Sequence, residues 1–415
     1  MNKTMLSLRE NLPMFFMLCF SGNPMVTSQS YSNSLLIGYT VLLLFYVFFV
    51  IDLQIFKKSL GIFIGLLLSF SVIVFSQRII LGFVSYPGVL GIILKTILGL
   101  ATLLLYQNQK VDFLDAYIKV MTFLAILSLP FFLLNQFGVY GLDTGKSLTK
   151  SLLIYTSFYP FPGEVVARNS GMFWEPGAFS GYLILALLFI ALKNRKFQIG
   201  PYRKEIPWIL IGLLTTMSTT GFIVLGVIIT INSLQNYKFG KLVFMPIAII
   251  IMYYSYYSLD FMKEKIDYQY SLVKNMNEND VSNTRMGAFY MDLKYIKSQP
   301  IIGNGLHIKT RFRFHHNVTG DIGHGNGMSN FMASWGIPLF LFWLFCVFKF
   351  ALKVSRSYWT SFSVLFIIIL LLQGEQFLNY PVFLSFFFLP FVYQNILSKK
   401  NKIHLIKNYF NINFG

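Results

Sequence analysis

Two stretches of the sequence place arginine near a side chain that can transfer a proton. In the first, Arg168 precedes Glu175-Pro176-Gly177 by seven residues, at the start of an apolar run. Guanidinium binds phosphate oxygens through paired hydrogen bonds and keeps its charge at physiological pH, and a glutamate can act as a general base. An acid followed by proline also suits the first turn of any helix. The stretch therefore indicates either an anion site or a plain helix start.

The second stretch begins at Arg285 and continues into "RFRFHHNVTGDIGHGNG", which is rich in arginine and histidine. Imidazole titrates near neutral pH, so these histidines suit proton transfer or phosphate contact. A zinc site would need several of them in a tight four-coordinate arrangement, usually with cysteine or carboxylate help, and we predict no metal site. A solvated loop would also accommodate such arginines. The candidate residues in this stretch are Arg285, Arg311, Arg313, His315, His316 and His324.

A single lysine, Lys95, lies inside the apolar run "LGIILKTILGL". A charge in the middle of a membrane-spanning helix costs at least about 2.5 kcal/mol. We therefore expect Lys95 to face a cavity, a partner or a bound anion.

The composition is that of an integral membrane protein. Of the 415 residues, 55% are hydrophobic and 12% are charged, and apolar runs long enough to span a bilayer recur along the chain. The net charge of +18 would suit nucleic-acid binding in a soluble domain, but the basic residues mostly flank apolar runs. That placement is typical of membrane orientation and contact with anionic lipid, so no nucleic acid is expected as a partner. Cys19 and Cys346 both lie inside apolar runs, which favours neither a disulfide framework nor a metal cluster.

The apolar pattern predicts an all-α polytopic membrane protein with about twelve transmembrane helices. The candidate spans are residues 9–21, 34–52, 59–77, 84–106, 113–134, 172–192, 206–217, 219–235, 241–258, 331–352, 358–374 and 377–396. With the N-terminus in the cytoplasm, every short cytoplasmic connection is basic, as the positive-inside rule requires.

This topology divides the chain into membrane helices and two long outer loops. The parts are residues 1–134, N-terminal membrane helices; 135–171, outer loop; 172–258, central membrane helices; 259–330, long outer loop; 331–396, C-terminal membrane helices; and 397–415, cytoplasmic tail. Charged and aromatic residues alternate in the longer loop, which predicts amphipathic helices lying over the membrane. Functional residues are expected in these two periplasmic loops.

The run 206–235 has to reverse direction to preserve this topology, although each limb would be only about 22 Å long. The reversal is expected at "MSTTG", Met217 to Gly221, where small hydroxylated residues can bond the carbonyls of a broken helix. A continuous tilted helix is the alternative.

Four blocks of the sequence, read in order between about residues 165 and 350, resemble those of a known family. They are "RNSGMFWEPGAFSGYL", "STTG", "TRMGAFYMDLKYIKSQPIIGNGL" and "HGNGMSNFMASWGIPLFLFWLF". They resemble the O-antigen polymerase and ligase superfamily, specifically the Wzy-type polysaccharide polymerases. The resemblance implies a GT-C-like glycosyltransferase of the bacterial inner membrane, independent of metal and cofactor, with an active site that faces the periplasm.

The implied reaction moves a growing O-antigen or capsule glycan from undecaprenyl diphosphate to the next lipid-linked repeat unit. The implied partners are this lipid-linked oligosaccharide, membrane lipid and a chain-length regulator protein. Within the superfamily, a ligase that transfers finished chains to lipid A core is the alternative. From a different class, a lipid-linked oligosaccharide flippase or transporter would also have about twelve spans.

The resemblance also assigns roles to particular residues. Arg168 and Arg285 match the family's loop arginines, His324 matches its loop histidine, and Glu175 matches its Glu-Pro block. The turn "MSTTG" lacks the arginine that follows serine in many relatives, which moves that diphosphate contact to Lys95. The arginines and Lys95 would bind the diphosphate, and His324 or Glu175 would act on the acceptor hydroxyl.

Overall fold

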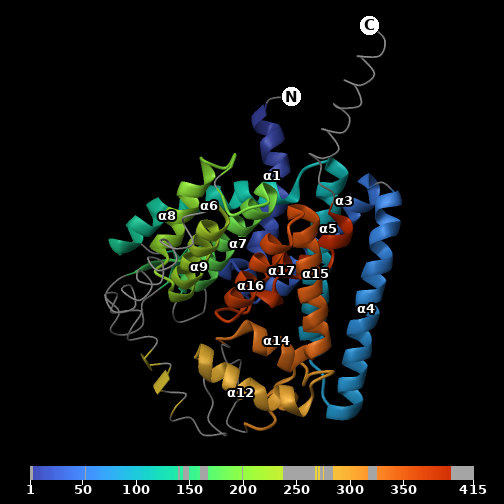
Figure 1. Ribbon diagram of the computed structural model, residues 1–415. Helices are drawn as coiled ribbons and strands as arrows, with labels where there is room; N and C mark the ends of the chain where they lie inside the picture. The colour runs from blue at the N-terminus through green and yellow to red at the C-terminus, as the bar shows by residue number, and fades with distance from the viewer. Residues whose placement is uncertain are drawn as a thin grey trace.

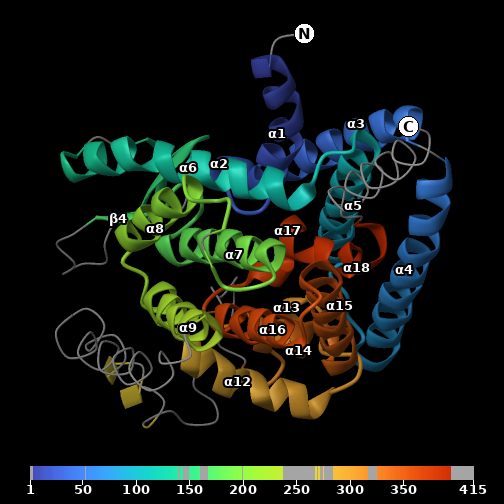
Figure 2. The ribbon, with the colours of Figure 1, turned by 45° about the horizontal axis from the view of Figure 1, so that its top comes forward.

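A computed structural model of the chain shows a bundle of apolar helices with a smaller group of short helices at one end (Figures 1 and 2). The structure describes residues 3–51, 53–138, 141–143, 149–158, 167–198, 200–236, 267–268, 270–271, 274, 284–315 and 325–393. The short helices α12 (Arg285–Ser298), α13 (Ile308–Arg311) and α14 (Gly327–Trp335) are called the cap below. In Figure 1, α12 and α14 lie at the bottom of the bundle, far from α1 (Lys3–Cys19).

The protein is an integral membrane protein by the character of its helices. It is 75% helical, and six helices in the described residues are long and apolar enough to cross a membrane. They are α3 (Ser32–Val50), α4 (Leu53–Leu81), α5 (Tyr86–Gln109), α6 (Phe113–Gln136), α7 (Pro176–Asn194) and α15 (Ile337–Ser355). Phe45 and Phe48 on α3 and Phe75 on α4 are 64%, 69% and 67% exposed. Such apolar outer faces are stable in lipid, and the helix bonds all its interior backbone groups internally.

The described residues do not confirm the predicted number of about twelve spans. Besides the six long helices, the described residues contain three shorter apolar helices: α8 (Glu205–Thr215), α9 (Thr219–Asn236) and α16 (Tyr358–Leu372). The predicted span 241–258 lies outside the described residues. The predicted spans 331–352 and 377–396 are wrong as continuous helices.

Residues that cannot continue a helix break these two segments. α14 and α15 are separated at Gly336, whose φ is +88° and whose Cβ, if present, would lie 1.9 Å from the Ile301 carbonyl oxygen. Only glycine fits there. In the last apolar segment Pro381 and Pro390 each start a new turn, because proline cannot extend the helix before it. The segment therefore forms η1 (Phe377–Asn379), α17 (Pro381–Leu384), η2 (Ser385–Phe387) and α18 (Leu389–Val392).

The centre of the bundle is α7. Sixteen of its 19 residues are buried, and α6, α8, α9, α15 and α16 pack around it (Figure 2). A helix that is apolar on all sides is stable only when neighbours surround it. α7 begins after Glu175, and its last turn carries Lys193, whose Nζ lies 3.3 Å from Asp112 and 2.5 Å from Asp115. Because 19 helical residues extend about 28 Å, these two polar ends lie on opposite sides of the bundle.

The chain reverses direction between α8 and α9, as the sequence predicted. Tyr202, just before α8, donates a hydrogen bond to Asp115, and Gln235, in the last turn of α9, accepts one from the Phe197 backbone. Both helices therefore have one end beside the C-terminus of α7. The turn Met217–Gly221 joins their other ends, and Met217 adopts a φ of +46° there. The reversal brings this turn to the end of the bundle where α7 begins.

A small antiparallel sheet lies in the segment 135–171, which was predicted as a loop. Its strands are β1 (Leu142–Asp143), β2 (Thr149–Leu152), β3 (Tyr155–Phe158) and β4 (Arg168–Asn169), in the order β1-β2-β3-β4. Ser151 pairs with Thr156 across β2 and β3, and Phe158 pairs with Arg168 across β3 and β4. The described residues thus contain this sheet besides the helices, and the long apolar helices are consistent with the prediction of an all-α membrane protein.

The cap attaches to the bundle through polar contacts to the ends of the long helices. Gln77, near the end of α4, donates to the Ile302 carbonyl at 2.6 Å and to the Ser334 carbonyl at 3.0 Å. α12 lies against α14, and its buried residues recur on one face, at Gly287, Ala288, Met291, Asp292, Tyr295 and Ile296. A helix with one buried face is amphipathic, which fixes its rotation. That rotation determines where Arg285, the first residue of α12, points.

Candidate active site

Arg285 is held at the first turn of α12 by three contacts. The Thr284 hydroxyl caps the helix by accepting from the Gly287 backbone N–H at 3.2 Å. Arg285 Nε donates to the Gly374 carbonyl at 3.0 Å, and Nη2 donates to Glu375 Oε1 at 3.0 Å. The Arg285 side chain remains 24% exposed, while that of Glu375 is 9% exposed. We call Arg285 and Glu375 the site pair.

The Glu-Pro-Gly block meets the site pair. Glu175 is the N-cap residue of α7, and Gly177 lies in the first turn. A Cβ on Gly177 would lie 2.4 Å from Glu375 Oε1 and 3.3 Å from Arg285 Nη2. Glycine is therefore required for the start of α7 to approach the pair. Arg285 and Glu375 follow Glu175 by about 110 and 200 positions in the chain, and the fold brings all three together.

Glu175 and Glu375 form a carboxyl pair with unequal surroundings. Burial is the main cause that raises the pKa of Glu375 well above its usual value, and the nearby charge of Glu175 and a side-chain hydrogen bond with it raise it further. Arg285 acts in the opposite direction but does not outweigh burial. Two close carboxyl groups in such a place share a proton, because both cannot ionise together. The pair can therefore hold one proton between its two carboxyl groups and transfer it.

Lys95 approaches the same region through an aromatic stack. Its Nζ lies 5.1 Å from the centre of the Tyr380 ring, and this ring stacks on Trp174 with centroids 4.8 Å apart. Trp174 directly precedes Glu175 in the chain. The indole also packs against Gly22, where an added Cβ would lie 2.3 Å from the Trp174 ring. The cation thus rests on a ring instead of in hydrocarbon, as expected for a charge inside a membrane helix.

Two further segments border the site pair. In the N-cap of α14, Asn326 Nδ2 donates to Gln373 Oε1 at 2.7 Å, and a Cβ on Gly327 would lie 2.0 Å from the Glu375 carbonyl oxygen. In the predicted "STTG" turn, Thr220 Oγ1 would lie 3.0 Å from a Cβ on Gly374. Four of the blocks that carry the family resemblance therefore meet at the site pair. His316 and His324 lie outside the described residues.

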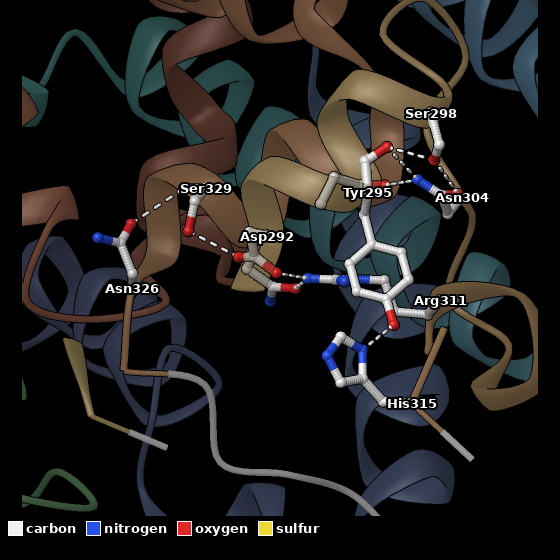
Figure 3. Close-up of polar contacts among 10 residues, drawn as sticks. Asp292, Tyr295, Ser298, Asn304, Arg311, His315, Asn326 and Ser329 are labelled. Atoms are coloured by element: carbon white, nitrogen blue, oxygen red, sulfur yellow. Dashed lines mark hydrogen bonds and ion pairs between the residues drawn. The ribbon is translucent and has the colours of Figure 1, made fainter. Parts of the chain in front are cut away.

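Arg311 belongs to a different constellation, inside the cap (Figure 3). Its Nη2 donates to Asp292 Oδ1 at 2.5 Å and to Asn330 Oδ1 at 3.0 Å, and Ser329 Oγ donates to Asp292 Oδ2 at 2.6 Å. The guanidinium also lies 5.1 Å from the Tyr295 ring centre. We call Asp292 and Arg311 the cap pair. Its charges are matched and buried, so it holds α12, α13 and α14 together.

His315 and Arg313 also take part in cap contacts. His315 is buried, and its Nδ1 shares a hydrogen bond of 2.5 Å with the Tyr295 hydroxyl (Figure 3). Burial raises the pKa of Tyr295 to about 12, so this hydroxyl keeps its proton at physiological pH. The Arg313 guanidinium lies 4.8 Å from the Phe314 ring centre. These contacts bring neither residue to the site pair.

Arg168 lies in the sheet, in β4. Its neighbour Asn169 is buried and donates hydrogen bonds to Ser128 Oγ and Thr215 Oγ1, both at 2.9 Å. β4 is thereby fixed between α6 and α8. The described contacts place Glu175, Lys95 and Arg285 around one cluster and Arg168 on the strand that leads into it.

Glu375 was missed as a candidate in the sequence, where it falls between the predicted spans 358–374 and 377–396. A signal was available. Glu375 is the only Asp, Glu, Lys or Arg between Arg356 and Lys399, and it follows Gly374. An isolated acid among apolar segments of a membrane protein is a functional candidate for the same reason as Lys95.

Within the described residues, no group of three or more His, Cys, Asp or Glu side chains is arranged to hold a metal ion. The side chains of the cluster offer two kinds of chemistry. Arg285 and Lys95 can neutralise an anion, and the carboxyl pair can transfer a proton.

No protein-family model and no curated protein matches the chain. The family resemblance of the four blocks accordingly stays a prediction. The interpretation of the site rests on its geometry.

Proposed function

We propose that this protein is a polysaccharide polymerase that transfers a growing O-antigen or capsule glycan from undecaprenyl diphosphate to an incoming lipid-linked repeat unit. The observation that carries the proposal is the contact between the Glu175-Pro176-Gly177 block and the Arg285–Glu375 pair. A membrane-embedded bundle with cations and a proton-sharing carboxyl pair at one end suits a reaction between two lipid-anchored substrates. In the proposal the enzyme is a GT-C-like glycosyltransferase that needs no metal or cofactor.

The roles follow from the charges. Arg285 and Lys95 neutralise the diphosphate, whose negative charge grows as the bond to the sugar breaks. The carboxyl pair of Glu175 and Glu375 takes the proton of the acceptor hydroxyl as that oxygen attacks the sugar carbon. Arg168 guides the diphosphate from the strand beside α7, and His324 is a further candidate to orient the acceptor.

The charge distribution supports an outward-facing site in the inner membrane. Arg195 follows α7 and accepts a hydrogen bond from Thr360 at the start of α16, and α15 ends at the basic residues Lys353 and Arg356. These basic ends lie together with Lys193, at the opposite end of α7 from the site pair. The positive-inside rule assigns such an end to the cytoplasm. The site pair then faces the periplasm.

Deletion of the protein from its host tests the proposal. A polymerase deletion leaves single repeat units attached to their final acceptor, because export and ligation use other proteins. The measurement is a gel of the surface glycan with and without the protein. Added chelator should change nothing in the reconstituted reaction. A deletion strain that still displays long surface polysaccharide contradicts the proposal, and long chains that accumulate on undecaprenyl diphosphate identify a ligase.

A transporter of lipid-linked oligosaccharide is the second candidate, favoured by the broken helices. The turn between α8 and α9 and the short helices from Phe377 to Val392 lie beside the site pair and Lys95. Interrupted helices around ionisable residues are typical of transporter binding sites. In that case deletion leaves single units on the cytoplasmic face of the membrane.

A further inference from the structure

We propose that Glu375 occupies Arg285 until the lipid diphosphate arrives, and that the diphosphate displaces it from Arg285, so that Glu375 acts with Glu175 as the proton acceptor for the attacking hydroxyl. This inference rests on the proposed function, which assigns the diphosphate to Arg285. It adds a catalytic residue and couples its activation to donor binding.

The contacts of Arg285 allow such an exchange. Nε donates to the Gly374 carbonyl, so the guanidinium stays anchored to the backbone when its other partner changes. Only the bond from Nη2 to Glu375 Oε1 has to break. A carboxylate oxygen and a phosphate oxygen compete for the same planar donors. The Arg285 side chain is 24% exposed and that of Glu375 is 9% exposed, so an anion can approach the arginine from solvent.

The surroundings of Glu375 supply its second partner. Glu175 is close enough to share a hydrogen bond with it, and Gly177 leaves the space beside Oε1 free of a side chain. Glu375 also lies between α16 and η1, outside both helices, so its side chain can turn without disturbing a helix. When Glu375 leaves Arg285, the carboxylate therefore keeps Glu175 as its partner and loses the cation.

This move makes Glu375 a stronger base at the moment a base is needed. Contact with Arg285 lowers the pKa of Glu375, whereas burial and Glu175 raise it. Displacement by the diphosphate removes the lowering contribution, and the pKa rises further. General-base catalysis improves as the pKa of the base approaches the working pH.

The reaction step is balanced without any further reactant. The acceptor oxygen forms a bond to the anomeric carbon of the donor sugar, and the bond from that carbon to the diphosphate oxygen breaks. The electron pair leaves with the diphosphate, which Arg285 and Lys95 neutralise. The hydroxyl proton passes to the carboxyl pair of Glu375 and Glu175 and leaves to solvent after product release.

The first test uses the full-length wild-type protein in lipid nanodiscs and a probe that binds but cannot react, the methyl ester of undecaprenyl diphosphate. Both phosphates of this diester stay ionised across the neutral range, so they contribute no protons. Because displacement raises the pKa of Glu375, binding should take up a fraction of a proton per site, and affinity should increase as the pH falls. The sites in which Glu375 stays ionised are those that can accept the hydroxyl proton. Calorimetry in buffers of different ionisation enthalpy measures this uptake. Binding without proton uptake overturns the inference, and this measurement needs no variant.

The second test separates binding from turnover in the variant Glu375→Gln. Glutamine can still accept from Arg285 but competes weakly with phosphate, so probe affinity should rise on the order of tenfold. Without the base, kcat should fall by about 10²- to 10⁴-fold. Proton uptake on binding should disappear. Glu205→Gln, in the first turn of α8 and outside the site, is the matched control and should retain wild-type affinity and kcat.

Glu175→Gln distinguishes the two carboxyl groups. Removing the charge of Glu175 lowers the pKa of Glu375, so the acid limb of the kcat/KM profile should move to lower pH while activity remains. An inactive Glu175→Gln beside an active Glu375→Gln would make Glu175 the base and overturn the inference. If the wild type transfers no glycan at all, the proposed function fails, and this inference fails with it. If the wild type transfers glycan and Glu375→Gln keeps both its kcat and its affinity, the inference alone fails.

Discussion

Each of two arginine–carboxylate pairs has one member on α12, and the two pairs differ in burial and in the groups that surround them. In the cap pair, Asp292 is fully buried and the Arg311 side chain is 4% exposed. Ser329 donates a further hydrogen bond to the carboxylate, and Asn330 accepts one from the guanidinium. In the site pair, the Arg285 side chain is 24% exposed and borders a second carboxyl group. In the cap pair one carboxylate balances one guanidinium, and solvent anions have no access to the arginine. The site pair has an arginine that an anion can reach and more carboxyl groups than one cation neutralises.

The difference teaches that residue type alone does not separate a binding arginine from a structural one. Residue type marks both Arg285 and Arg311 as candidates in the long polar segment before α15, and only the family resemblance gives Arg285 a role. Their surroundings separate them, because the Arg311 side chain is only 4% exposed and is paired with a fully buried carboxylate, so a ligand has no access to it. We therefore leave Arg311 out of the proposed site.

The largest effect on stability is expected at the cap pair. Asp292→Ala leaves the charge of Arg311 buried without its carboxylate, which should cost about 3–5 kcal/mol of unfolding free energy. Thermal unfolding of the purified protein measures the loss. The double variant Asp292→Leu with Arg311→Met removes both charges and should recover most of it. An unchanged unfolding temperature in Asp292→Ala would show that the pair is not structural.

A smaller effect is expected where the helix start approaches the site pair. In Gly177→Ala the new Cβ would lie 2.4 Å from Glu375 Oε1, so the carboxylate must move away from Arg285. Overpacking of this kind costs about 1–3 kcal/mol, and glycan transfer should fall as well. Gly38→Ala is the matched control, because no atom lies within 4 Å of its Cβ. Equal activity and stability in both variants would contradict the close approach.

The smallest effect concerns pH. The folded protein raises the pKa of Glu375 above its ordinary value of 4.5, mainly through burial. Its contribution to stability is therefore present below that value and is lost as the pH rises through the raised pKa. Glu375→Gln stays neutral and should lose no stability in that range. The unfolding temperature of the wild type should fall relative to the variant as pH increases, whereas a constant difference would refute the raised pKa.

The membrane character could be predicted from the sequence because it depends on composition and run length alone. α5, α6 and α7 lie where the apolar runs predicted them, and the reversal at Met217–Gly221 followed from charge parity. The break at Gly336 could not be predicted, since it depends on the approach of the Ile301 carbonyl, which is a tertiary contact. The sheet formed by β1 to β4 has strands of two to four residues, too short for a periodic signal.

The site was predictable in its parts and not in its assembly. The sequence indicated Glu175, Lys95 and Arg285 as candidates because each is a charged residue in or beside an apolar segment, where a purely structural role leaves it incompletely explained. Their meeting point is Glu375, which no spacing rule links to them. Arg311 and His315 were chosen by the same reasoning, but their partners Asp292 and Tyr295 come from an ordinary amphipathic helix.

The most direct test of the central claim compares Arg285→Lys with Arg311→Lys in proteoliposomes supplied with lipid-linked repeat units. Lysine keeps the charge and removes the planar fork. The readout is the length of the glycan ladder per folded molecule, together with the unfolding temperature. We predict that Arg285→Lys lowers polymerisation by about 10²- to 10³-fold at an unchanged unfolding temperature. Arg311→Lys should lower the unfolding temperature and leave the ladder of the folded fraction intact. A wild-type ladder in Arg285→Lys, or a lost ladder in stable Arg311→Lys, would contradict the account.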